Sequence, residues 1–186
     1  MQTVIAAGGA LEAGGFVADC REVRMQPVVA DASAVGSAGF GDARAWQAML
    51  DRFDELFADM DAGAAVGFVP RAGSGIQPGK HVAGLVDCGA GVPMMKWQAH
   101  GAGMTVSLLD YPGFQDAGVD LLFVVDDAAL QTLRAALDGD ALSQIKRLIR
   151  QGSIMFFVLR TKFELQDAGY EEFLDTLGLA FLGACR

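Results

Sequence analysis

The chain has 186 residues, of which 52% are hydrophobic and 20% are charged, and its mean hydropathy is +0.32. This composition excludes intrinsic disorder over most of the length, because it supplies enough apolar side chains for a buried core. The 14 Lys and Arg against 23 Asp and Glu give a net charge of −9, which disfavours binding to the polyanionic surface of nucleic acid. We therefore expect one folded domain over 1–186.

The three cysteines indicate a reducing compartment. Cys20, Cys88 and Cys185 are odd in number and lie far apart, whereas disulfide-stapled secreted modules carry even sets at close spacing. The first residues lack the basic segment of a signal peptide, and no uncharged apolar run reaches the ~18 residues that a membrane span needs. We expect a cytoplasmic protein that does not enter a membrane.

The first region, 1–41, is rich in glycine and alanine and is predicted to be largely irregular. Short strands are expected within it at 3–6, 16–17 and 23–29. The small residues of 31–41 indicate a loop.

A long helix is predicted over 43–60. Apolar side chains recur there at spacings of three and four residues, which places them on one helical face. Asp42 is the expected N-cap, and Gly63 lies just beyond the end. The buried face is expected to hold Trp46, Met49, Leu50, Phe53, Leu56, Phe57 and Met60.

The middle of the chain is predicted to be β-structure. Residues 94–100 alternate between apolar and polar types, as do residues 104–109, and the glycines of 101–103 supply a tight turn between them. The fully apolar run 121–125 indicates an interior strand. Two further strands are expected at 64–69 and 82–86.

The C-terminal part combines helices with one strand. Helices are predicted at 128–137, with Asp127 as its cap, and at 141–150. Six consecutive apolar residues at 154–159 indicate a buried strand, and a last helix is expected over 164–184. Together the elements predict an α+β fold. Its mainly antiparallel sheet of about five to seven strands is packed by one helix from the N-terminal half and three from the C-terminal half.

A glycine-rich segment, 71–81, is the most conspicuous candidate for ligand binding. Its backbone N–H groups could hold the oxygens of a phosphate, with a lysine as the counter-charge. The segment departs from a phosphate-binding loop because serine replaces the first glycine, Pro78 removes an N–H group, and histidine stands where Ser or Thr binds magnesium. A small enzyme or ligand-binding domain that holds an anionic small molecule is therefore the alternative function. Its ligand-binding residues would be Gly73, Ser74, Gly75, Lys80 and His81.

No catalytic residue, cofactor or metal is expected. The only histidines are His81 and His100, and Cys88 forms a nucleophile–base pair with one of them only if the strands fold them together. These three side chains and Asp87 lack any standard metal-ligand spacing.

Charges of one sign are grouped along the chain. Acidic residues coat the predicted helices 43–60 and 164–184, whereas 141–163 holds five basic residues and no acid. Surfaces of segregated sign suit docking to an oppositely charged protein. The leading hypothesis is a non-catalytic acidic interaction protein, namely an accessory, inhibitor or immunity-type partner of a protein with a basic surface. The candidate partner-binding residues are Asp51, Asp54, Glu55, Asp59, Glu171 and Asp175, and the candidate anion-binding residues are Lys146, Arg147, Arg150 and Arg160.

Two further possibilities stay open. The helices within 127–150 have the order of a helix-turn-helix, but the net charge of −9 disfavours DNA binding through 141–150. Formation of a homo-oligomer is compatible with the sequence.

Overall fold

The computed structural model describes residues 37–76, 91–101 and 103–179, all of which lie in one compact unit, Asp31–Arg186. The single domain over 1–186 therefore stays a prediction, and the strands expected within 1–36 and at 82–86 lie outside the described residues. One turn of helix, α1 (Ser37–Phe40), stands where the sequence predicted a loop. It is anchored because Phe40 is buried and its carbonyl accepts the indole N–H of Trp46 at 2.8 Å.

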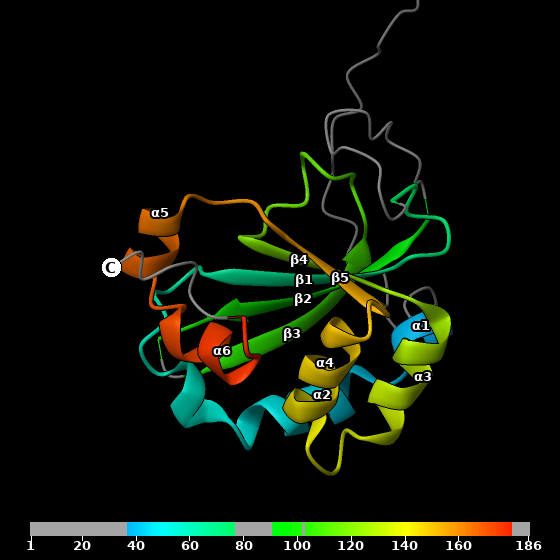
Figure 1. Ribbon diagram of the computed structural model, residues 1–186, viewed down its shortest axis with the longest axis horizontal. Coiled ribbons are helices and arrows are strands. Elements are labelled where there is room, and N and C mark those ends of the chain that lie inside the picture. Colours follow the sequence, from blue (N-terminus) through cyan, green and yellow to red (C-terminus); the bar gives the residue numbers. More distant parts are fainter. Residues whose placement is uncertain (1–36, 77–90, 102, 180–186) are drawn as a thin grey trace, which may run out of the picture. The chain divides into compact units, whose positions relative to one another are not determined.

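A mixed five-stranded sheet forms the centre of this unit (Figure 1). Three of the four neighbouring strand pairs are antiparallel, whereas β1 runs parallel to β4. The predicted α+β fold with a mainly antiparallel sheet is confirmed. In the order β3-β2-β1-β4-β5, the strands are Met104–Asp110, Pro93–Ala99, Ala65–Pro70, Leu121–Val125 and Ile154–Val158.

Helices cover one face of the sheet (Figure 1). They are α2 (Ala43–Asp51), α3 (Asp127–Ala135), α4 (Ala141–Arg150) and α6 (Glu171–Thr176). Aromatic rings fill the space between the layers, and the ring of Phe68 lies 4.4 Å from that of Trp97 and 4.9 Å from that of Phe123, between centroids. Within the described residues, no helix is both long enough and apolar enough to cross a membrane.

The opposite face of the sheet has a smaller core. Alternate strand residues such as Val69, Leu122 and Val124 point to it, and they pack with Ile76 and Tyr111 from the segments that follow β1 and β3. The strand β4 is therefore buried on both faces, which explains why its sequence is a continuous apolar run rather than an alternating one.

The helix predicted over 43–60 is shorter than expected. It ends at Asp51, and a 3-10 helix, η1 (Asp54–Phe57), follows. Hydrogen bonds between residues three apart, as in a 3-10 helix, mark the transition from α2 to η1; one runs from the N–H of Phe53 to the carbonyl of Leu50 at 2.9 Å. The tighter winding still buries Phe57, but it leaves Phe53 only partly buried.

The helix predicted over 164–184 is also wrong in its described part. Two short helices, α5 (Lys162–Asp167) and α6, replace it and are separated at Gly169. This glycine has φ +76°, and its backbone lies directly against the carbonyl group of Asp59. A continuous helix would need the right-handed conformation there, so the contact between two distant segments ends α5.

Candidate functional site

The parallel strands β1 and β4 end side by side, with Pro70 paired to Val125 in register. From there the chain leaves in two directions. After β1 it continues to Ile76, which packs in the core of one face, whereas after β4 it enters α3, whose Leu130 packs in the core of the other face. Diverging connections of this kind open a crevice outside the carboxyl ends of neighbouring strands, which is where ligands bind in open α/β sheets.

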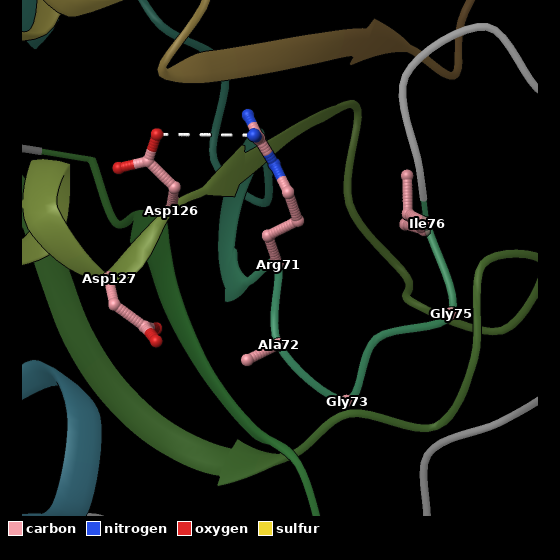
Figure 2. Close-up of a pocket in the computed structure, with 7 residues that line it drawn as sticks. All are labelled: Arg71, Ala72, Gly73, Gly75, Ile76, Asp126 and Asp127. Carbon is pink, nitrogen blue, oxygen red and sulfur yellow. Dashed lines mark ion pairs between the residues drawn. The ribbon is translucent and has the colours of Figure 1, made fainter.

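A pocket of about 610 Å³ occupies this crevice (Figure 2). We call it the crevice pocket. The segment after β1 forms one wall and the first residues after β4 form the other. The lining residues are Arg71, Ala72, Gly73, Gly75, Ile76, Asp126 and Asp127.

The wall after β1 is a loop that is stabilised by hydrogen bonds of a serine side chain to the backbone of the same loop. The hydroxyl of Ser74 donates to the carbonyl of Arg71 at 2.9 Å and accepts the N–H of Ile76 at 3.2 Å. Gly73 and Gly75 have φ of +82° and +71°, which explains the two glycines, since other residues rarely adopt that conformation. Both hydrogen bonds of the buried Ser74 hydroxyl stay within the loop, so Ser74 shapes the loop from beneath and is not among the residues that line the pocket.

Arg71 ties this loop to two other elements. Its Nη2 donates to the carbonyls of Gly152 and Ser153, at 3.1 and 3.3 Å, in the turn between α4 and β5. Its Nη1 lies 3.9 Å from the Oδ2 of Asp126 (Figure 2). The guanidinium group therefore joins three chain segments behind the crevice pocket.

The wall after β4 carries two adjacent carboxylates. Asp126 is the N-cap of α3, because its Oδ1 accepts the N–H of Ala129 at 2.7 Å; the sequence had assigned this cap to Asp127. Asp127 is instead the first residue of α3 and is exposed. In the part of the chain that the structure describes, its carboxylate has no hydrogen bond and no ion pair.

The structure brings only part of the predicted ligand-binding set together. Gly73 and Gly75 line the crevice pocket and Ser74 supports it, whereas Lys80 and His81 lie outside the described residues. Sequence reasoning missed the charged residues of the pocket. The available signal was that a buried strand ends in each case at a charged residue: Arg71 after β1, and Asp126 and Asp127 after β4.

The predicted partner-binding carboxylates lie on several elements, and their role stays a prediction. Asp51 ends α2, Asp54 begins η1, and both line a second pocket of about 420 Å³ together with His100 at the end of the β2–β3 hairpin. No group of His, Cys, Asp and Glu among the described residues could hold a metal ion. Of the remaining predicted residues, Glu55 lies on η1, Asp59 follows η1, and Glu171 and Asp175 both lie on α6; all four are exposed.

The predicted anion-binding residues do not share one element. Lys146, Arg147 and Arg150 lie on α4, whereas Arg160 follows β5. Arg160 donates from Nε to the Oδ1 of Asp120 at 2.7 Å, and this hydrogen bond raises the pKa of its guanidinium group.

Comparisons with known proteins give a limited result. No protein-family model matches the chain, and no curated protein matches it. Two solved structures are similar to it. One, described as a UbiJ-SCP2 ubiquinone synthesis protein, is 13% identical with a TM-score of 0.34 and covers 77% of this chain and 93% of its own. The other, a conserved hypothetical protein from Thermus thermophilus suggested to be a sterol carrier protein, is 14% identical with a TM-score of 0.36 and covers 78% and 94%.

The interpretation of the chain as an acidic interaction protein is wrong. The continuous acidic helices on which that interpretation depended are missing, because the first ends at Asp51 and the last is divided at Gly169.

Proposed function

We propose that this protein binds a small organic molecule in the crevice pocket. The observation that carries the proposal is the place of the pocket, between the diverging exits of the parallel strands β1 and β4. Its volume of about 610 Å³ is within the range of pockets that enclose small ligands and cofactors.

The two walls support binding because the sheet fixes them relative to each other. The N–H of Arg71 donates to the carbonyl of Val125 at 2.7 Å, so the backbone hydrogen bonds between β1 and β4 continue up to the edge of the pocket. The N–H of Asp126 donates to the carbonyl of Ser153 at 3.1 Å, which fixes the other wall to β5. A pocket whose walls are already positioned loses little conformational entropy when a ligand enters.

The lining combines apolar residues with charged groups. Ala72 and Ile76 offer hydrocarbon, and the two glycines let a ligand approach the backbone closely. Asp126 and Asp127 stand on the wall formed with α3, and the guanidinium group of Arg71 reaches from the wall after β1 toward Asp126 (Figure 2). Such a lining orients a ligand that has one polar end and one apolar body.

The test is a thermal-shift screen of the purified chain against a defined set of amino acids, amines, carboxylates, sugars and nucleotides. A compound that binds, added at a free concentration of about 100 times its Kd, should stabilise the fold by roughly 2.7 kcal/mol and so raise the Tm by several degrees. Ala72→Trp should reduce this rise, because Ala72 is exposed at the pocket and a large ring there occupies part of its volume.

The matched control is Ala135→Trp, which adds the same ring at an exposed position of α3 that does not line the pocket. This variant should keep the full rise in Tm. Equal loss in both variants, or an undiminished rise in Ala72→Trp, would place the ligand elsewhere and overturn the proposal.

A further inference from the structure

We infer that the crevice pocket selects a small organic cation, a primary amine or an amidine with a compact apolar body, and that Asp127 is the residue that recognises it. This inference rests on the proposed function. Three charged side chains line the pocket, and they differ in how far hydrogen bonds and ion pairs within the protein already satisfy their charges.

The positive charge of Arg71 is engaged by the protein. Two backbone carbonyls accept from its Nη2, and the carboxylate of Asp126 faces its Nη1 at 3.9 Å. Its Nε is buried and has no partner among the described residues, so this atom is out of reach of a ligand in the pocket. An anionic ligand would therefore have to compete with Asp126 for the Nη1 atom of Arg71.

The negative charge of Asp126 is engaged as well. One carboxylate oxygen accepts the N–H of Ala129 at 2.7 Å, and the other faces Arg71. Removing either contact would uncap α3 or leave Arg71 without its counter-charge. Asp126 and Arg71 thus balance each other, and neither is available to a ligand without a loss elsewhere.

The carboxylate of Asp127, unlike the charged groups of Arg71 and Asp126, has no partner among the described residues. Asp127 lines the pocket and is exposed. The amino end of α3 contributes about half a positive charge at the same place, which leaves a weak net negative charge at the pocket. Attraction therefore depends on direct contact with the Asp127 carboxylate, which a primary amine or an amidine makes through charge-assisted hydrogen bonds.

The rest of the lining sets the shape of the cation. Ala72 and Ile76 are apolar, and Gly73 and Gly75 have no side chains to fill the space. A hydrated inorganic ion would leave these surfaces unused, whereas a flat or compact hydrocarbon body would cover them. The pocket is accordingly suited to an amine that carries such a body.

The experiment is a titration followed by amide chemical shifts, with three probes of nearly equal size: benzylamine, benzyl alcohol and benzoate. Benzylamine should shift the amides of 72–76 and 127–129 and should bind more tightly than benzoate. Asp127→Asn should weaken benzylamine about fivefold, equivalent to about 1 kcal/mol, and leave the affinity for benzyl alcohol unchanged. Asp138→Asn is the control, since it removes the same charge at an exposed position outside the pocket.

The outcomes separate this inference from the proposed function. Binding of benzyl alcohol or benzoate at 72–76 with no preference for benzylamine would overturn the ligand class and leave the pocket as a binding site. An equal effect of Asp127→Asn and Asp138→Asn would also overturn it, because the cation would then respond only to overall charge. If no probe, and no compound of the thermal-shift screen, acts at the pocket amides of the folded chain, the proposed function fails too.

Discussion

The hydroxyl of Tyr170 donates a hydrogen bond to the carboxylate of Asp120, and the two oxygen atoms lie 2.7 Å apart inside the protein. The same carboxylate accepts the N–H of Ala65 at 3.0 Å and the Nε of Arg160 at 2.7 Å. Tyr170 stands directly before α6, whereas Ala65 begins β1 and Asp120 precedes β4. The bond therefore fastens α6 to the end of the sheet that lies opposite the crevice pocket.

Replacing Tyr170 by phenylalanine should destabilise the fold by about 1–3 kcal/mol, because the buried carboxylate of Asp120 loses its shortest neutral donor. Urea unfolding followed by circular dichroism measures the change. The m-value should stay the same, since the variant exposes no additional surface on unfolding. A loss below about 0.5 kcal/mol would show that the hydroxyl contributes no more than an ordinary surface group.

Tyr170 should also make stability fall at high pH. Burial, followed by the hydrogen bond and charge of Asp120, raises the pKa of Tyr170 above its ordinary value. Above about pH 10 the unfolded chain loses this phenol proton while the folded chain keeps it, so the free energy of unfolding decreases as the pH rises. Unfolding at pH 8 and pH 10.5 should show a smaller decrease in Tyr170→Phe than in the wild type. Identical decreases would contradict the assignment.

The close approach of Gly169 to Asp59 gives a second stability test. Gly169→Ala should cost several kcal/mol or prevent folding, because a methyl group there meets the carbonyl of Asp59. Gly63→Ala is the control, with a φ of +100° but no atom within 4 Å of the added carbon. It should cost only the conformational penalty, about 1 kcal/mol. Equal costs would mean that the backbone conformation alone requires glycine at 169.

Gln47 closes the edge of the sheet with its side chain. Its Nε2 donates to the carbonyl of Met104 and its Oε1 accepts the N–H of Val106, each at 2.8 Å, so the amide takes the place of a neighbouring strand on β3. Gln47→Ala should cost roughly 1–2 kcal/mol and speed hydrogen exchange at Val106. Gln131→Ala, on the exposed surface of α3, should change stability by less than about 0.5 kcal/mol. Unchanged exchange at Val106 would contradict this role.

The described strands could be predicted because their signals are local. The alternation in β2 and β3 and the apolar run of β4 need only a few neighbouring residues to be recognised, and each strand lies within a residue or two of its predicted range. Helix ends were harder. The end of α5 combines a glycine cap at Gly169, which the local sequence contains, with the contact of that glycine to Asp59 across more than a hundred residues, which no local window contains.

The candidate site was only half predictable for the same reason. The glycines of the loop are visible in the sequence, since Gly73 and Gly75 supply backbone conformations that other residues avoid. Arg71 and Asp126, however, become neighbours only because β1 pairs in parallel with β4, which is a property of the strand order. The hydrophobic pattern does not specify that order.

The most direct test of ligand binding in the crevice pocket is to locate a bound ligand by intermolecular nuclear Overhauser effects. The compound that raises the Tm most in the thermal-shift screen is added to the chain with labelled methyl groups. If the ligand binds in the crevice pocket, contacts are expected from it to the methyl groups of Ala72 and Ile76, which line the pocket. Contacts confined to Met155 of β5 and Leu159 just after it, or to Met104 at the second pocket, would show that the ligand binds elsewhere.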